Sequence, residues 1–167
     1  KYEQIKKYWK KQEIHTHLMT KCPNKLINQV SKFSDIIFVH KEIDENLEDT
    51  KQTTKKNNCE IGIVLHAINN YDNDLESITD NFSNIMILCI PEAGYSGQPF
   101  LEKSYDLIQK INEIQKRKNI NLFVDGGINK ENIKNINAEN IISGSDVLNN
   151  KDPREQIMRL KTFGRYI

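Results

Sequence analysis

Short apolar runs alternate with longer amphipathic stretches along this chain of 167 residues. The runs are rich in Ile and Val and are apolar on both faces, which is typical of strands buried in a parallel sheet. The hydrophobic pattern predicts six such strands: Glu13–Met19, Asp35–His40, Glu60–Leu65, Asn84–Ile90, Asn121–Asp125 and Asn140–Ser143.

The intervening stretches carry apolar residues at helical spacing. They predict helices at Tyr2–Lys11, Asn24–Phe33, Glu42–Lys56, Asp74–Thr79, Phe100–Lys118, Lys130–Ile136 and Pro153–Phe163. The strongest pattern is that of Phe100–Lys118, where Leu101, Tyr105, Leu107, Ile108, Ile111 and Ile114 form one stripe. In the last helix Pro153 suits the first turn, and Asp152 is the expected cap.

Strict alternation of strands and helices predicts the α/β class, with a parallel sheet covered by helices. A complete (β/α)₈ TIM barrel takes about 250 residues, or about 31 for each βα unit. The chain therefore supplies about six units, and we expect residues 1–167 to form a single, partial TIM-barrel domain made of the last six. Because the first residue is Lys1 rather than Met, we expect either that the chain is processed or that further residues precede it.

The composition narrows the choice of partners. The chain has 24 basic and 23 acidic residues and a formal net charge of +1, which gives no reason to expect a nucleic acid or an anionic membrane as partner. No apolar stretch approaches the length of a membrane span. Its three cysteines, Cys22, Cys59 and Cys89, are widely spaced, so we expect reduced thiols and a cytoplasmic location.

Polar residues gather where the predicted strands end, the edge at which parallel α/β folds bind ligands. The histidines His15, His17, His40 and His66 all lie near such ends, and Asp125 closes the fifth strand. A single histidine there is usually a satisfied core or rim residue. Four at one rim favour a metal or acid/base role, above all for His17.

Glycine-bearing segments follow the last three predicted strands. They are Gly94-Tyr95-Ser96-Gly97, Gly126-Gly127 and Gly144-Ser145. Glycines let backbone N–H groups approach an anion closely, and barrels often bind phosphate at the loops after their last strands. The alternative is that the glycines only permit tight turns. Asp146 does not suit a phosphate site, and we expect it to point outward into its helix.

These motifs resemble the ribulose-phosphate 3-epimerase family. The resemblance rests on His17-Leu18-Met19, Gly94 to Phe100, Val124-Asp125-Gly126-Gly127 and Ser143-Gly144-Ser145, which occur in the family's order and spacing. Asp152-Pro153-Arg154 is also similar to the start of the family's last helix. The resemblance covers nearly the whole chain and implies a TIM barrel of the ribulose-phosphate-binding type.

The resemblance also implies an activity, which is metal-assisted proton transfer at C3 of a ketopentose or ketohexose phosphate through an enediolate. By position, His17 and Asp125 would be ligands of a divalent metal (Zn, Fe, Mn or Co), and Asp125 would also be one acid/base. His17 and Met19 would face the sugar. The phosphate would be held by Gly94, Tyr95, Ser96, Gly97, Gly126, Gly127, Gly144 and Ser145.

The chain also departs from the family's pattern. The family carries its other carboxylate and two further metal ligands on a strand that has no counterpart here. In addition, Cys89 stands in place of a methionine, His66-Ala67 in place of Asn-Pro, and Ala93 in place of a proline. Two ligands alone would bind a divalent ion weakly.

Three functions therefore stay open at this point. The chain is the larger part of an active epimerase, a non-catalytic phosphate-binding relative, or a different enzyme of the phosphate-barrel superfamily in which the four histidines form a new metal site. The first alternative implies a sugar-phosphate substrate, and the second implies phosphate binding alone. Six strands leave two open sheet edges, so we also expect a homo-oligomer.

Overall fold

The computed structural model of the protein describes residues 4, 7–8 and 11–164. The chain forms two compact units, residues 1–64 and residues 65–167. The helix expected at 2–11 falls largely outside the described residues.

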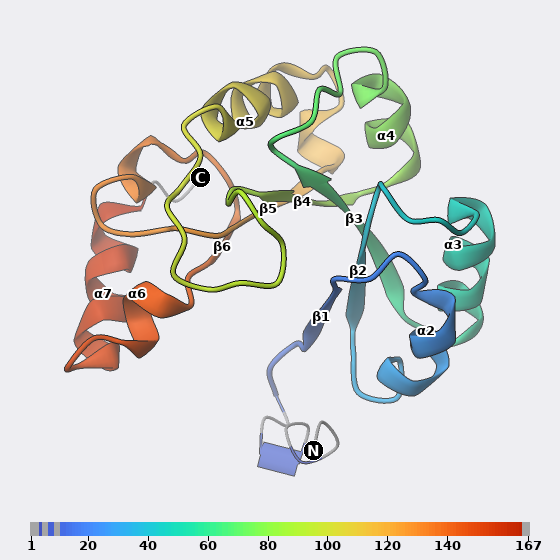
Figure 1. The fold of residues 1–167 in the computed structure, drawn as a ribbon, viewed down its shortest axis with the longest axis horizontal. Coiled ribbons are helices and arrows are strands. Elements are labelled where there is room, and N and C mark those ends of the chain that lie inside the picture. Colours follow the sequence, from blue (N-terminus) through green and yellow to red (C-terminus); the bar gives the residue numbers. More distant parts are fainter. Residues whose placement is uncertain (1–3, 5–6, 9–10, 165–167) are drawn as a thin grey trace. The chain divides into compact units, whose positions relative to one another are not determined.

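The first unit contains three parallel strands in the order β1-β2-β3, with helices α2 and α3 between them (Figure 1). Its elements are β1 (His15–Leu18), α2 (Asn24–Val30), β2 (Ile36–His40), α3 (Leu47–Lys56) and β3 (Glu60–His66), which continues into the second unit. The sequence predicted all five elements, although β1, α2 and α3 are shorter than expected.

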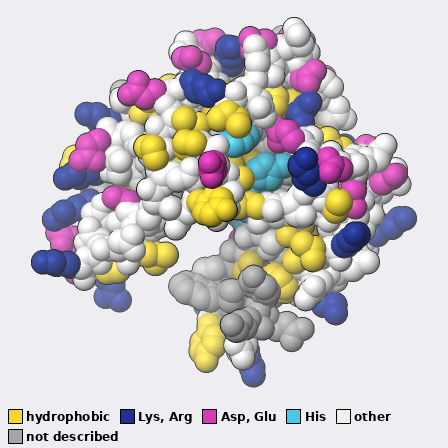
Figure 2. Space-filling view, in the orientation of Figure 1, with side chains coloured by type: hydrophobic (Ala, Val, Ile, Leu, Met, Phe, Trp, Pro, Cys, Tyr) yellow, Lys and Arg dark blue, Asp and Glu magenta, His cyan; other side chains and the backbone are white. Residues whose placement is uncertain are grey.

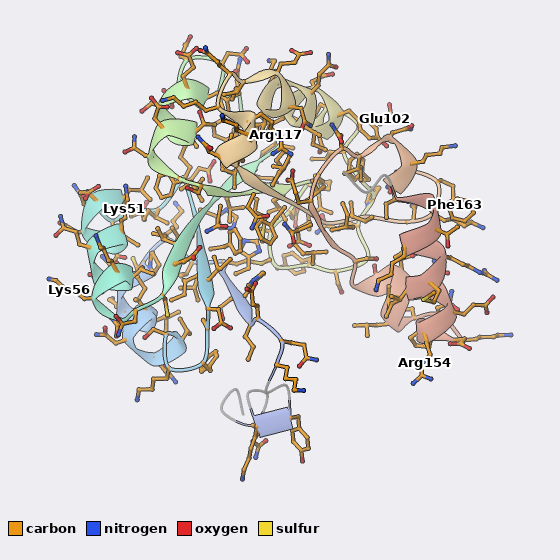
Figure 3. The ribbon with its side chains drawn as sticks, turned by 180° about the vertical axis from the view of Figure 1, so that it is seen from behind. Lys51, Lys56, Glu102, Arg117, Arg154 and Phe163 are labelled. Carbon is orange, nitrogen blue, oxygen red and sulfur yellow. The ribbon has the colours of Figure 1, made fainter. Side chains whose placement is uncertain are left out.

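Packing in the interior of the first unit explains why residue 62 is a glycine. Phe38 of β2 lies opposite Gly62 of β3, and a side-chain carbon at Gly62 would come within 2.3 Å of the Phe38 ring. Only glycine therefore fits opposite this buried phenylalanine. On α3 the small residue Thr54 is buried, whereas Lys51 and Lys56 lie on the outer side of the helix (Figure 3).

The second unit contains three further parallel strands in the order β4-β5-β6. Its elements are α4 (Leu75–Asn81), β4 (Asn84–Leu88), α5 (Ser104–Glu113), β5 (Asn121–Asp125), β6 (Asn140–Ile142), α6 (Ser145–Leu148) and α7 (Pro153–Phe163), with 3₁₀ turns η1 (Arg117–Asn119) and η2 (Ile133–Asn135). Strands alternate with helices in both units, so the predicted α/β class is confirmed. The Asp152 carboxylate caps α7 as expected, accepting from the Glu155 amide at 2.9 Å.

The helix predicted at Phe100–Lys118 is shorter than expected at both ends. It begins only at Ser104 because the Leu101 amide donates to the Cys89 carbonyl at 2.7 Å, which commits this segment to the end of β4. It ends at Glu113, and Ile114 is already extended. The apolar stripe therefore overstated the length of the helix.

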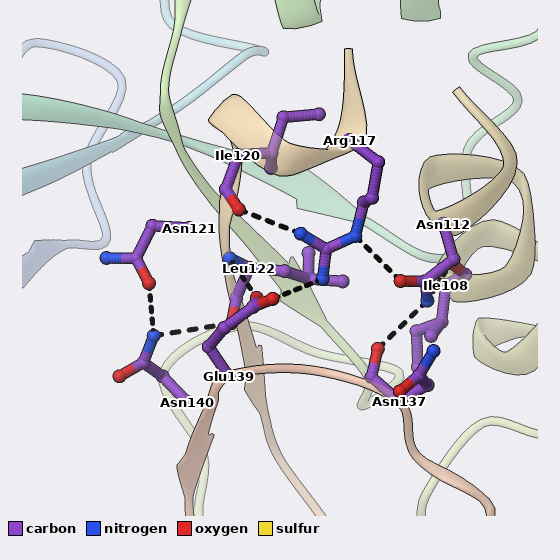
Figure 4. Close-up of polar contacts among 9 residues, drawn as sticks. All are labelled: Ile108, Asn112, Arg117, Ile120, Asn121, Leu122, Asn137, Glu139 and Asn140. Carbon is purple, nitrogen blue, oxygen red and sulfur yellow. Dashed lines mark hydrogen bonds and ion pairs between the residues drawn. The ribbon is translucent and has the colours of Figure 1, made fainter. Parts of the chain in front are cut away.

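Arg117 organises the turn that follows α5 (Figure 4). Its guanidinium donates to the Asn112 side chain at 2.7 Å, to the Ile120 carbonyl at 2.8 Å and to the Glu139 carboxylate at 2.6 Å. The other Glu139 oxygen accepts from the Leu122 amide at 2.9 Å. This network fixes the entry into β5 and explains why the helix does not continue.

The helix predicted at Lys130–Ile136 is also wrong, since only the 3₁₀ turn η2 forms there. The Asn129 side chain accepts from the amides of Glu131 and Asn132, and the Asn132 side chain donates to the Gly127 carbonyl. Asparagine side chains thus take the backbone partners that a helix would need. The short helix α6, in contrast, was not predicted.

Charged side chains of both signs are interspersed over the visible surface (Figure 2). On α7, for example, Arg159 pairs with Glu155 at 2.6 Å, one helical turn away. Such exposed pairs contribute little to stability.

Candidate functional site

Asp125 is the last residue of β5 and is half-buried. The Cys89 amide, just after β4, donates to the Asp125 carbonyl at 2.7 Å. Burial raises the pKa of the Cys89 thiol to about 12, and the negative charge of Asp125 acts in the same direction. The Asp125 carboxylate therefore lies close to the carboxyl end of β4, where the first glycine-bearing loop begins.

Four glycines after β4 and β5 adopt backbone conformations that other residues rarely tolerate. Their φ angles are +92° at Gly94, +78° at Gly97, +104° at Gly126 and +67° at Gly127. Gly144 differs, because its φ is −97° and a side-chain carbon there would meet nothing within 4 Å. The backbone thus requires glycine in the first two loops but not in the third.

The loops after β4 and β5 touch each other through glycine. A side-chain carbon on Gly126 would come within 2.7 Å of Ile90, and one on Gly127 within 2.5 Å of the Phe100 backbone nitrogen. The loop after β5 is joined in turn to the segment after β6, since the Ser143 hydroxyl donates to the Ile128 carbonyl at 3.2 Å.

All three loops border one cavity of about 560 Å³, a size typical of small-molecule sites. Gly97 comes from the first loop, Gly127 from the second and Ser145 from the third. The other lining side chains that carry an uncharged polar group are Gln98, Tyr105, Asn129, Asn132 and Asn149. The three loops thus border one cavity within the second unit, and the binding of phosphate there stays a prediction.

Two acidic residues, Glu102 and Asp146, also border this cavity. The Asp146 carboxylate accepts from the side-chain amide of buried Gln156 on α7 at 2.6 Å. This bond holds the carboxylate toward α7, but Asp146 still borders the cavity, so its outward direction stays a prediction. Helix α6 itself is a single turn of four residues and so contributes little dipole.

Gln98 holds the first glycine loop in shape, a role that the sequence did not reveal. Its side-chain nitrogen donates to the carbonyls of Glu92 and Tyr95, both at 2.7 Å, and its side-chain oxygen accepts from the Glu92 amide at 3.0 Å. The loop is otherwise exposed, with Tyr95 67% exposed. In the sequence, the sign of this role is an amide side chain, that of Gln98, directly after Gly97.

In the first unit the structure brings two of the four histidines together. His17 Nε2 on β1 lies 2.8 Å from His40 Nε2 on β2, and His40 Nδ1 lies 3.7 Å from the Glu42 carboxylate. Met19 follows β1 directly and is 46% exposed. His17 and Met19 thus belong to the first unit, and Asp125 with the glycine loops to the second.

The other two histidines have different partners. His15 is the first residue of β1 rather than near its end, and its Nε2 lies 3.2 Å from the Glu13 carboxylate. His66 Nε2 lies 2.7 Å from the Ile90 carbonyl. Among the described residues no three His, Cys, Asp or Glu side chains form a metal-binding group. The structure therefore gives no support to a new site made of all four histidines.

Three comparisons bear on the function. Residues 1–148 match the model of the ribulose-phosphate 3 epimerase family. The ribulose-phosphate 3-epimerase of Aquifex aeolicus is 29% identical over 90% of this chain and 69% of its own length. That of Buchnera aphidicola subsp. Baizongia pistaciae is 32% identical over 81% of this chain and 61% of its own length.

Solved structures show the same fold. The 3-hexulose-6-phosphate synthase of Salmonella typhimurium superposes with a TM-score of 0.72 at 14% identity, covering 96% of this chain and 77% of its own. KGPDC of Streptococcus mutans gives a TM-score of 0.69 at 14% identity, covering 97% of this chain and 76% of its own. Over the described residues, no helix is long and apolar enough to cross a membrane.

Proposed function

Because the chain belongs to the ribulose-phosphate 3-epimerase family, we propose that the protein inverts C3 of a ketose phosphate, converting D-ribulose 5-phosphate to D-xylulose 5-phosphate. The chain spans between 61% and 69% of the length of the two relatives described above. The activity of the whole protein is therefore a proposal.

One observation carries the proposal, namely the cavity bordered by Gly97, Gly127 and Ser145. A phosphate is best held by several backbone N–H groups at once, and glycines allow the closest approach. The Gln98 side chain keeps the first loop in its shape. Asp125 does not itself line this cavity, but it directly precedes Gly126 and Gly127, and we propose that phosphate bound there directs the rest of the substrate toward it.

Asp125 is the proposed acid/base. Removal of the C3 hydrogen as a proton leaves an enediolate, and return of a proton on the opposite face inverts the carbon. A half-buried carboxylate at the mouth of a parallel sheet is suited to accept that proton. The group on the opposite face is assigned to no residue of this chain.

The donor chemistry of His17 and Asp125 fits a divalent metal, since imidazole nitrogen and carboxylate oxygen are both common ligands of Zn, Fe, Mn and Co. We assign both residues to that metal on the family resemblance. When bound, the metal supplies Lewis-acid stabilisation of the negative charge on the substrate oxygens. In this assignment His17 of the first unit would supply a ring nitrogen, and Asp125 of the second unit would supply a carboxylate that also transfers the proton.

The test is turnover of D-ribulose 5-phosphate, measured in a coupled assay for D-xylulose 5-phosphate. Asp125→Asn is expected to lower kcat by about 10²–10⁴-fold, because an amide cannot accept the proton. Asp106→Asn, an exposed aspartate in the first turn of α5, is the matched control and is expected to keep full activity. Equal rates in the two variants would contradict the proposal.

A role in binding without turnover is the alternative, and it is favoured by the absence of any three-ligand group among the described residues. The same protein then binds ribose 5-phosphate but shows no turnover with any divalent metal added. Turnover that depends on Asp125 eliminates this alternative.

We also propose that the protein is cytoplasmic and forms homo-oligomers. The first proposal is supported by its three cysteines, all of which are thiols without a disulfide. The second is supported by exposed apolar side chains on α6 and α7, among them Leu148, Met158 and Phe163. Sedimentation equilibrium measures the mass in solution, and a monomer at micromolar concentration would contradict the second.

A further inference from the structure

Three side chains of the first unit lie in a row, Glu42, His40 and His17. The two imidazole rings are stacked, with centroids 4.9 Å apart and an interplanar angle of 23°. The His40 side chain is only 12% exposed, whereas that of Glu42 is 40% exposed. The row therefore begins with a half-exposed carboxylate and ends at the histidine that the proposed function assigns to the metal.

The contacts restrict which ring nitrogens carry hydrogen. His17 Nε2 and His40 Nε2 are 2.8 Å apart, so one of them donates and the other accepts. The Glu42 carboxylate, 3.7 Å from His40 Nδ1, favours the hydrogen on that nitrogen. His40 Nε2 is then the acceptor, and His17 Nε2 carries the hydrogen that it donates. The lone pair of His17 is thereby placed on Nδ1.

We infer that Glu42 and His40 are positioning residues that present His17 Nδ1 to the divalent metal. The inference rests on the proposed function, which makes His17 a ligand. Metal-binding histidines usually donate their second ring N–H to a carboxylate or carbonyl, which fixes both the tautomer and the ring orientation. Here the acceptor is His40, and the Glu42 carboxylate contacts His40 rather than His17.

The first experiment reads the tautomers of the metal-free protein directly. Long-range ¹H–¹⁵N correlation spectra of the ¹⁵N-labelled chain distinguish a histidine protonated on Nδ1 from one protonated on Nε2. The expected result is hydrogen on Nε2 of His17 and on Nδ1 of His40. Hydrogen on Nδ1 of His17 would overturn the inference whether or not the protein is an epimerase.

The second experiment adds Zn²⁺ to the same sample. A large shift of the His17 Nδ1 resonance is expected as this nitrogen binds the metal. If the tautomers are as expected but Zn²⁺ leaves His17 unchanged, the metal assignment of the proposed function fails, and with it the metal part of the inference. The two failures are thus distinguished in one titration.

Variants then test the positioning role through Zn²⁺ affinity, measured by calorimetry. His40→Phe keeps a ring of similar size but removes the acceptor, and is expected to weaken binding by about 10–100-fold. His40→Gln supplies an amide oxygen as acceptor and is expected to restore part of the loss. Glu42→Gln, at a half-exposed position, is expected to weaken binding less than His40→Phe does.

Glu13→Gln is the matched control, because Glu13 lies 3.2 Å from His15 on the same strand as His17 but outside the row. Its Zn²⁺ affinity is expected to equal that of the unchanged protein. Equal affinity in Glu13→Gln and His40→Phe would overturn the inference. So would a His40→Gln variant that binds no better than His40→Phe, provided that thermal melts show both variants to be folded.

Discussion

The two units hold their candidate site residues by different means. In the second unit the loops are shaped by the backbone, with positive φ at four glycines and a contact of Gly127 with the Phe100 backbone that leaves no room for a side chain. In the first unit His17 is held by other side chains, with His40 at 2.8 Å and Glu42 behind it.

This difference predicts how each part responds to substitution. A backbone-built site fails through strain when a glycine gains a side chain, whatever the chemistry of that side chain. A site built from side chains fails when the partner loses its hydrogen-bonding group, even if the shape is kept. Substitutions of each kind separate these two modes, and the largest effect is expected at Gly127.

Gly127→Ala is expected to lower the free energy of unfolding by about 3 kcal/mol, because alanine disfavours a φ of +67° and its β-carbon would lie 2.5 Å from the Phe100 nitrogen. Gly144→Ala has neither problem and is expected to change stability by less than about 0.5 kcal/mol. Urea denaturation measures both. Equal midpoints would show that the loops are not held by close backbone contact.

The second unit also contains a side-chain network, so both modes can be compared inside one unit. Arg117→Met removes three hydrogen bonds of a mostly buried guanidinium and is expected to lower the free energy of unfolding by about 2 kcal/mol. Arg159→Met breaks only an exposed pair with Glu155 and is expected to cost about 0.5 kcal/mol. Thermal melts of the two variants measure which one loses more stability. A larger loss in Arg159→Met than in Arg117→Met would contradict this prediction.

Gln98→Glu tests whether a side chain shapes the backbone-built site. The new carboxylate cannot donate to the Glu92 and Tyr95 carbonyls, so the first loop is expected to loosen. We expect about tenfold weaker binding of ribose 5-phosphate, equal to about 1.4 kcal/mol. Gln115→Glu, at an exposed position after α5, adds the same charge without touching the loop. Titration calorimetry measures the affinity for ribose 5-phosphate. Equal affinities of Gln98→Glu and Gln115→Glu would contradict the role of Gln98 in shaping the loop.

The smallest effect is expected from pH. Burial raises the pKa of the Cys89 thiol from its ordinary value of 9.0 to about 12. Its contribution to stability is therefore complete below pH 9 and is lost as the pH rises toward 12. Between pH 8 and pH 9.5 the protein is expected to lose about 0.8 kcal/mol relative to Cys89→Ala. Identical pH profiles of the two proteins, from urea denaturation, would contradict burial of this thiol.

Much of the fold was predictable because strand burial leaves a strong signal. The apolar runs located all six strands, and β5 and α7 were predicted at their observed bounds. Local hydrogen bonds were not predictable in the same way. The Leu101 amide is bound to Cys89 and the Asn129 side chain to two amides, and neither partner follows from hydrophobic spacing.

In the candidate site, too, the residues that follow buried strands were predictable, whereas the contacts between side chains were not. The positions of Asp125, Gly126 and Gly127 after a buried strand indicated a loop at the sheet's carboxyl edge, and the structure places them there. The contact of His17 with His40 depends on the register of two strands, β1 and β2, that are 18 or more residues apart. The sequence showed both histidines but not that contact, and it showed Gln98 beside the loop glycines but not the hydrogen bonds by which its side chain holds the first loop.

The most direct test of the central claim is a titration of ribose 5-phosphate followed by ¹H–¹⁵N correlation spectra of the backbone amides. We expect the amides of Gly97, Gly127 and Ser145 to shift together with a single Kd, because the three loops border one cavity. Shifts confined to one loop, or found elsewhere in the protein, would contradict a shared phosphate site.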